Sequence, residues 1–265
     1  MIRPPAFRVA VAGKGGSGKS MIAGTLARLL ARRGHQVLAL DSDPLPGLAI
    51  SLGIEPGDEP MLEAYSQQDG AGEWRLVRNL KTETIVRRAA RSGPDGVLFL
   101  QFGKVRTCSP VPASSIQAFW GIATELPAGA WTIVHDLPAG TRQPFGGWAV
   151  AADVLLLVVE PTQKSILSAR RLTGVTELSS SRTRLVGVVA NKVRSAADLD
   201  MTTAAMPGVE LIAAVPFDPS AAAADRDGIA PIDRDPGAPA VRAVDDLADR
   251  LESIAAESTS SEEGP

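Results

Sequence analysis

Short apolar runs alternate with longer amphipathic stretches along most of the chain. The runs are rich in Val, Leu, Ile and Ala and hold few polar residues, which is typical of β-strands buried on both faces. They occupy 7–12, 36–40, 96–101, 131–135, 154–159, 185–190 and 211–215. Because such strands need cover on both sides, we expect helices above and below one sheet.

The stretches between these runs have the spacing of amphipathic helices. In 20–33, for example, Ile22, Leu26, Leu29 and Leu30 fall on one helical face. Further helices are expected at 85–91, 114–125, 164–178, 196–205 and 241–256. The alternation predicts an α/β fold with a mostly parallel sheet and helices on both faces. Segments 44–74 and 221–239 are rich in Gly, Pro and acidic residues and are predicted to be irregular.

The composition favours one globular domain. Hydrophobic residues make up 45% and charged residues 22% of the 265 residues, which suits a sizeable core. No linker divides the pattern of strands and helices, so we expect a single domain over 1–257. Residues 258–265 are polar and acidic, and we expect them to form a disordered tail.

Charge and cysteine content exclude several classes of protein. The 27 Lys and Arg against 30 Asp and Glu give a net charge of −3, which excludes a cationic surface over the whole protein. Cys108 is the only cysteine, so an intrachain disulfide and a four-cysteine metal or iron–sulfur site are excluded. The most apolar stretch, 149–159, contains Asp153 and is far shorter than the roughly 20 residues of a membrane helix. We expect a cytoplasmic protein without a targeting segment.

A glycine-rich sequence joins the first expected strand to the first expected helix. Residues 13–20 read G-K-G-G-S-G-K-S and match G-x-x-x-x-G-K-[ST], a loop that binds phosphate. Glycines let backbone N–H groups approach phosphate oxygens, and the helix N-terminus adds positive charge. Lys19 is placed to reach the β- and γ-phosphates, and the Ser20 hydroxyl to coordinate Mg²⁺. The predicted binding residues of the loop are Gly13, Gly15, Gly16, Ser17, Gly18, Lys19, Ser20 and Met21.

Acidic residues follow two of the expected strands. Asp41 and Asp43 end the second strand, and Asp136 follows the strand at 131–135. The carboxyl ends of parallel strands border the crevice in which ligands bind, so these side chains are candidates for holding Mg²⁺ or orienting water. For Asp41, a loop cap is the alternative role.

The chain has two histidines. His135 adjoins Asp136, where a catalytic role is one interpretation, but a hydrogen-bonded polar group at a strand end is the favoured one. His35 lies in the turn after the first expected helix, and we expect it on the surface.

With these motifs the chain resembles the deviant Walker A ATPases, a group that includes MinD, ParA, the nitrogenase iron protein and CooC. Lys14 at the second position of the loop is typical of that group, and the group's D-x-D-P motif matches at 41–44. The resemblance implies a homodimer that forms with ATP, in which Lys14 reaches the phosphates bound by the partner subunit. Lys14, Lys19 and Asp43 are then the catalytic candidates, and Asp43 positions the attacking water.

The group's D-x-x-A-G motif matches at Asp136, Ala139 and Gly140. Asp136 is therefore expected to bind Mg²⁺ through water, and Asp41 to belong to the Mg²⁺ environment. Gly140 is expected to sense the γ-phosphate through its backbone N–H.

Residues at the ends of the last two expected strands resemble the base pocket of the group. The asparagine that matches Asn191 hydrogen-bonds the adenine edge there, and the stem of Lys192 can pack on the ring. Pro216, Phe217 and Asp218 resemble the segment that closes the pocket. The resemblance implies ATP rather than GTP, a choice that the residues by themselves leave open.

The stretch V-V-E-P-T-Q-K-S at 158–165 resembles the CooC branch, whose members help to insert nickel into carbon monoxide dehydrogenase. That branch carries a C-x-C pair that binds metal at the dimer interface, whereas this chain has Cys108 alone. Two subunits supply only two thiolates, so Cys108 is expected to be buried or inert, and a metal-carrying role is in doubt. Reductase chemistry is not expected, because the paired cysteines of the nitrogenase iron protein have no counterpart.

Other functions in the group depend on surfaces. A ParA-like positioning ATPase would bind DNA through basic residues, and segment 75–91 carries Arg75, Arg78, Lys81, Arg87, Arg88 and Arg91 against Glu83. A solvated helix face is the favoured interpretation of this segment. Membrane binding of the MinD kind is disfavoured, because acidic residues outnumber basic ones in the last helix.

A nucleotide-binding adaptor with little hydrolysis is a third alternative. The complete set of loop lysines and carboxylates argues against it. We predict a Mg²⁺-ATP-dependent homodimeric switch that hydrolyses ATP slowly and acts on a protein partner, with metallocentre maturation as one such role.

Overall fold

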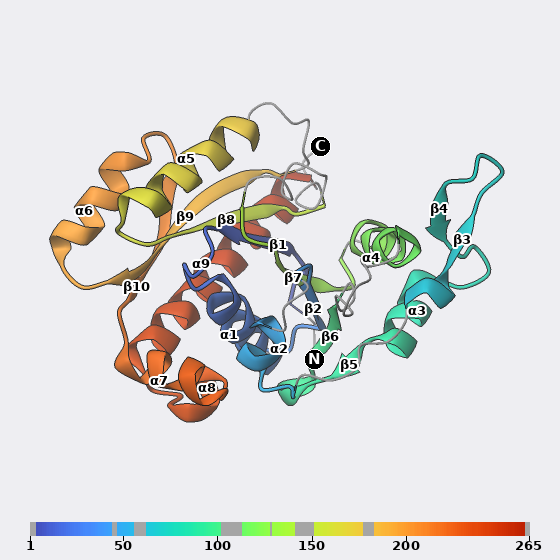
Figure 1. Ribbon diagram of the computed structural model, residues 1–265, viewed down its shortest axis with the longest axis horizontal. Coiled ribbons are helices and arrows are strands. Elements are labelled where there is room, and N and C mark those ends of the chain that lie inside the picture. Colours follow the sequence, from blue (N-terminus) through green and yellow to red (C-terminus); the bar gives the residue numbers. More distant parts are fainter. Residues whose placement is uncertain are drawn as a thin grey trace, which may run out of the picture.

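The protein is described from a computed structural model (Figure 1). The structure describes residues 4–43, 47–55, 62–101, 113–127, 129–140, 151–176 and 183–262. Cys108 and Pro44 lie outside these residues. The expectation that Cys108 is buried or inert therefore concerns a residue that the structure does not describe.

One eight-stranded sheet forms the centre of the molecule, in the order β10-β9-β8-β1-β7-β2-β6-β5 (Figure 1). Neighbouring strands run parallel, except that β5 is antiparallel to β6. Each apolar run predicted to be a strand lies in this sheet, which confirms the α/β class. The strands are β1 Arg8–Gly13, β2 Val37–Asp41, β5 Arg91–Ser92, β6 Leu98–Gln101, β7 Thr132–Asp136, β8 Val154–Val159, β9 Leu185–Val193 and β10 Glu210–Pro216.

Alternate residues of the central strands face opposite layers of helices. Val9 and Val11 of β1 pack with α1 (Lys19–Arg32) and α9 (Pro239–Glu262), whereas Ala10 and Ala12 pack with α5 (Gln163–Thr176). Buried residues of β2 and β6 join α3 (Thr82–Ala89) and α4 (Ala113–Glu125), and α6 (Ala196–Ala205) follows β9. Helices therefore cover both faces, as predicted. None of the helices in the described ranges has the length and apolar character that crossing a membrane requires.

Two segments that were expected to be irregular contain regular structure. Segment 44–74 holds α2 (Gly47–Leu52), a 3-10 turn at Leu62–Tyr65 and the hairpin of β3 (Ser66–Gln68) with β4 (Trp74–Leu76), which projects beside α4 (Figure 1). Segment 221–239 holds most of α7 (Pro219–Asp227) and all of α8 (Pro231–Arg234). Outside both segments, a second 3-10 turn spans Pro94–Gly96. Proline in the first turn and glycine at the end delimit these helices rather than exclude them. Gly228 ends α7 in the left-handed region, with φ +68°.

The last helix and His35 also differ from expectation. Helix α9 continues to Glu262, whereas a disordered tail was expected from Ser258. His35 is buried rather than on the surface, because α9 covers the turn after α1. Its Nδ1 lies 2.8 Å from Thr132 Oγ1, and its Nε2 lies 2.8 Å from Glu252 Oε1 on α9.

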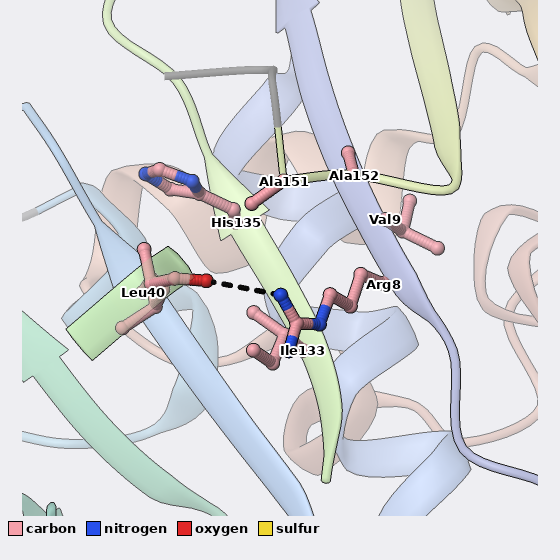
Figure 2. A pocket seen from close by; sticks show the side chains of 8 residues that line it. Arg8, Val9, Leu40, Ile133, His135, Ala151 and Ala152 are labelled. Atoms are coloured by element: carbon pink, nitrogen blue, oxygen red, sulfur yellow. Dashed lines mark hydrogen bonds between the residues drawn. The ribbon is translucent and has the colours of Figure 1, made fainter. Parts of the chain in front are cut away.

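A buried arginine connects β1 with the end of α4. Figure 2 shows the Arg8 side chain reaching between Leu40 and Ile133, with His135 nearby. Its Nη1 donates to Ala123 O at 3.3 Å, and its Nη2 donates to Leu126 O. A helix leaves its last carbonyls without intrahelical partners, and a cation there complements the helix dipole. Arg8 thus anchors α4 to the strand that leads into the glycine-rich loop.

Candidate functional site

The glycine-rich loop lies between the end of β1 and the start of α1, as its sequence predicts. Gly16 and Gly18 have φ values of +81° and +92°, which favour glycine. A Cβ on Gly13 would lie 2.5 Å from Val158 O, so only glycine fits against β8. The first turn of α1 has neither a side-chain cap nor an acidic residue. Its N-terminal N–H groups therefore favour an anion at this position.

The two loop lysines occupy different environments. The Lys19 side chain is buried, and its charge favours the ionised form of Asp136. Lys14 is half-buried, and its Nζ donates to Gly15 O at 3.3 Å on the exposed side of the loop. Lys19 is thus buried beside Asp136, while Lys14 makes an exposed contact with its own loop.

Asp136 at the end of β7 is buried beside the start of α1. Its carboxylate is hydrogen-bonded to Ser20, and its Oδ1 has no hydrogen-bond partner among the described residues. Burial raises the pKa of Asp136 to about 6, against the opposing effects of Ser20 and Lys19. Mg²⁺ binds through one or two carboxylates together with waters and phosphates. The hydroxyl of Ser20 and the carboxylate of Asp136 fit this ion.

Asp41 faces Asp136 on the neighbouring strand β2, in register with it. Its Oδ1 accepts from the backbone N of Asp43 at 2.9 Å, and its Oδ2 accepts from the backbone N of Leu48 at 3.4 Å. Burial, followed by the charge of Asp136, raises the pKa of Asp41 well above its ordinary value. The bonds fit the loop-cap alternative for Asp41. Asp43 is half-buried, and its charge acts on both carboxylates.

His135 is hydrogen-bonded to the loop after β2. Ser42 Oγ donates to Asp136 O at 3.0 Å and therefore accepts from His135 Nε2 at 3.1 Å. Burial lowers the pKa of His135 to about 3, so the ring is neutral at pH 7. This supports the favoured interpretation of His135 as a satisfied polar residue.

Gly140 lies in the loop after β7, next to the glycine-rich loop. It is exposed and has a φ of +104°. A Cβ on Gly15 would lie 3.6 Å from the Cβ of Ala139, which places the 139–140 segment beside Gly15. The predicted motif after β7 and the glycine-rich loop are therefore neighbours.

A cavity of about 600 Å³ opens beside the loop, a volume in the range of small-molecule sites. It brings together many predicted residues: Gly16, Gly18, Lys19, Ser20, Met21, Asn191, Lys192, Pro216, Phe217 and Asp218. The remaining predicted residues, Gly13, Lys14, Gly15, Ser17, Asp41, Asp43, Asp136 and Gly140, do not line it. Residues that line it without having been predicted are Gly47, Ser51, Glu160, Arg194, Ala221, Ala222 and Asp225. Glu160 had a signal in the sequence, since it directly follows an apolar strand.

The side chains of Asn191 and Lys192 bind the glycine-rich loop. Asn191 Nδ2 donates to Ser17 O at 2.7 Å, and Lys192 Nζ donates to Gly16 O at 2.7 Å. Lys192 Nζ also lies 2.5 Å from Glu160 Oε1. The sequence linked both residues to the base, and these contacts with the loop were not foreseen.

Phe217 and Asp218 play different parts at the far wall of the cavity. Phe217 is 39% exposed, and the Arg194 guanidinium lies 4.2 Å from its ring centroid. Asp218 Oδ1 accepts from Ser220 N at 2.8 Å, and its Oδ2 accepts from Ala240 N at 2.9 Å. Both carboxylate oxygens of Asp218 therefore bind the backbone at the starts of α7 and α9.

Some of the basic side chains of segment 75–91 make contacts within the protein. Arg75 Nε lies 2.6 Å from Asp69 Oδ2, and Arg91 Nη2 donates to Glu55 O at 2.7 Å. The Arg87 guanidinium lies 5.6 Å from the ring centroid of Trp131. Within the described ranges, no three His, Cys, Asp or Glu residues are grouped to hold a metal ion.

Comparisons with known proteins show the family of this chain. A family model described as the CobQ/CobB/MinD/ParA nucleotide binding domain matches residues 9–232. The carbon monoxide dehydrogenase accessory protein CooC of Rhodospirillum rubrum is 28% identical over 244 residues, which cover 87% of this chain and 91% of that protein.

Solved structures show the same fold. A ParA family ATPase from Chlorobium tepidum aligns with a TM-score of 0.73 and 18% identity, over 93% of this chain and 99% of that chain. MinD from Pyrococcus horikoshii, solved in complex with Mg-ADP, aligns with a TM-score of 0.69 and 18% identity, over 94% and 97% of the two chains. The chain therefore belongs to the MinD/ParA family of nucleotide-binding ATPases and is similar to its CooC type.

Proposed function

We propose that this protein is a Mg²⁺-ATP-dependent homodimeric switch that hydrolyses ATP to ADP and phosphate. The observation that carries the proposal is the buried carboxylate of Asp136, which is hydrogen-bonded to Ser20 and lies beside Lys19. A buried acid with an unpaired oxygen, a hydroxyl and a cation at a helix N-terminus suit a metal-bound polyphosphate.

Each residue has a distinct part in this proposal. The N–H groups at the start of α1 and Lys19 bind the phosphates, and the Gly140 N–H detects the γ-phosphate. Ser20 and Asp136 hold Mg²⁺, while Asp41 keeps the loop after β2 in place. Bound Mg²⁺ would offset the negative charge of the phosphates. Asp43 orients the water that attacks the γ-phosphate.

Dimerisation completes the site in this proposal. The contact of Lys14 with Gly15 O is exposed, so a second subunit can approach this lysine. We assign Lys14 to the phosphates of the partner subunit, so ATP binding and dimer formation support each other. The choice of ATP over GTP rests on the family, and Asn191, Lys192, Pro216 and Phe217 are the residues placed near the base.

We further propose a cytoplasmic ATPase domain over 1–257 that acts on a protein client. Support comes from the name of the Rhodospirillum rubrum relative, an accessory protein of an enzyme, and from a solved complex of MinC with MinD from Aquifex aeolicus. Metallocentre maturation is one form of this role. A ParA-like use of segment 75–91 on DNA is the alternative and predicts salt-sensitive binding to non-specific DNA in the presence of ATP.

The proposal is tested by comparing Lys14→Ala with Lys19→Ala. Lys19→Ala should lose nucleotide binding, measured by calorimetry. Lys14→Ala should bind ATP but remain monomeric in light scattering with a slowly hydrolysed ATP analogue. If wild-type protein binds ATP without hydrolysing it, alone or with client, the adaptor function replaces the switch.

A further inference from the structure

We propose that Glu160, Asn191 and Lys192 form a brace that positions the phosphate-binding loop before nucleotide binds. In this proposal Lys192 and Asn191 hold two carbonyls of the loop, and Glu160 holds Lys192. The inference rests on the proposed function, which it deepens by assigning positioning residues to the same site.

The brace joins three neighbouring strands near their carboxyl ends. Strand β1 leads into the loop, Glu160 follows β8, and Asn191 and Lys192 belong to β9. Lys192 Nζ lies 2.7 Å from Gly16 O and 2.5 Å from Glu160 Oε1. A single ammonium group therefore connects the end of β8 to the loop. The bond from Asn191 Nδ2 to Ser17 O, at 2.7 Å, lies directly beside it in the sequence.

The backbone of β9 is distorted where it presents Lys192. Lys192 has a positive φ of +61°, and Asp95, with a φ of +57°, is the only other non-glycine residue with a positive φ in the described part of the chain. The pairing with β10 passes from Asn191 to Val193, so Lys192 is skipped in the ladder. A bulge re-aims a side chain, and left-handed backbone is unfavourable in a residue that is not glycine. This distortion directs Lys192 toward the loop.

Holding these carbonyls also sets the direction of the loop amides. In a trans peptide the C=O and N–H groups point in opposite directions. The peptide between Gly16 and Ser17 is held at both ends, because the Ser17 N–H donates to Lys14 O at 3.1 Å. The peptide between Ser17 and Gly18 is held through its carbonyl by Asn191, which fixes the direction of the Gly18 N–H. Amides fixed in advance bind an anion without paying an ordering cost.

The charges of the brace predict which of its variants should lose the most affinity for nucleotide. Glu160 lines the same cavity as the loop, and its side chain is 18% exposed. Next to bound phosphates, its carboxylate is tolerated because Lys192 neutralises it. Removal of the lysine alone therefore leaves a negative charge facing the phosphates. Removal of both charges should be less damaging than removal of the lysine alone.

The test combines binding of ADP with hydrogen exchange in the full-length protein. We expect Lys192→Met to weaken ADP about tenfold or more, and the double variant Lys192→Met/Glu160→Gln to recover part of that loss. Lys192→Arg should stay within about threefold of wild type, because an arginine can bind both oxygens. Amides of the loop should exchange faster in Lys192→Met without nucleotide. Glu210→Gln, which breaks the exposed pair of Arg250 and Glu210 at 2.9 Å, is the control.

The outcomes separate the brace from the proposed function. Unchanged loop exchange and unchanged ADP affinity in Lys192→Met and Glu160→Gln would overturn the brace while leaving the ATPase intact. If wild-type protein does not bind nucleotide, the proposed function fails, and hydrogen exchange alone then decides the brace. Urea unfolding identifies any variant that does not fold, in which case Glu160→Gln and Lys192→Arg carry the test.

Discussion

Asp136 at the end of β7 is hydrogen-bonded to Ser20 in the first turn of α1, and the contact buries one carboxylate against the phosphate-binding loop. A second carboxylate, Asp41, faces it in register on β2. Ionisation of this pair is unfavourable unless a cation is close, because both groups are buried. The protonation of these carboxylates should therefore affect both the unfolding free energy of the protein and the binding of a cation at the site.

The pH dependence of stability follows from Asp136. Burial raises its pKa from 3.8 to about 6 in the folded protein, so the folded state binds the proton more tightly than the unfolded state. The resulting stabilisation is complete below about pH 4 and is lost as the pH rises through about 6. Without Mg²⁺, the unfolding free energy of wild type relative to Asp136→Asn should fall by about 1–3 kcal/mol between about pH 4 and 7.5.

Urea unfolding of both proteins at the two pH values measures this difference. The comparison cancels the contributions of titrating groups that do not interact with Asp136, so the difference reports Asp136 together with its neighbour Asp41, whose pKa the charge of Asp136 raises. A difference that stays constant across the pH range would contradict the assignment of a raised pKa to Asp136.

Position 18 requires glycine for two reasons, its backbone conformation and the lack of space for a side chain. Its φ of +92° disfavours any L side chain, and a Cβ would overlap the Asn191 amide. Gly208 has a φ of +79° but no atom within 4 Å of a Cβ, so Gly208→Ala is a matched control. Gly208→Ala should cost about 1 kcal/mol of unfolding free energy, and Gly18→Ala clearly more, with loss of nucleotide binding. Equal costs for both variants, with binding retained, would show that the loop tolerates the displacement of Asn191.

We predict that Asp218 acts on the fold rather than on the base. Its oxygens bind the backbone N–H groups of Ser220 and Ala240, so Asp218→Ala should lower the unfolding free energy by about 1–3 kcal/mol. Asp225 lines the same cavity, and Asp225→Ala should change it by less than about 0.5 kcal/mol. Urea unfolding measures both. If Asp218→Ala is as stable as wild type but loses ATP affinity, Asp218 belongs to the base pocket instead.

The sequence predicted the strands, the position of the phosphate-binding loop and the gathering of strand ends around it, because these depend on local patterns. Contacts between distant segments were not predictable. His35 is buried by Glu252, which lies 217 residues later in the chain. The bulge at Lys192 likewise depends on the register with β10. Segment 221–239 was predicted to be irregular from its Gly and Pro content, but Gly228 marks the end of α7.

Subunit mixing is the most direct test of the central claim that Lys14 acts on the partner's nucleotide. Lys14→Ala retains its own Lys19 and Asp43, whereas Asp43→Ala retains Lys14, and each alone should be nearly inactive. In a mixed dimer, the Asp43→Ala subunit supplies Lys14 to the intact remainder of the other site. We predict that equimolar mixing gives ATP hydrolysis well above the sum of the two separate rates. Hydrolysis equal to that sum, with mixed dimers detected by co-purification of one variant with a tagged copy of the other, would contradict the account.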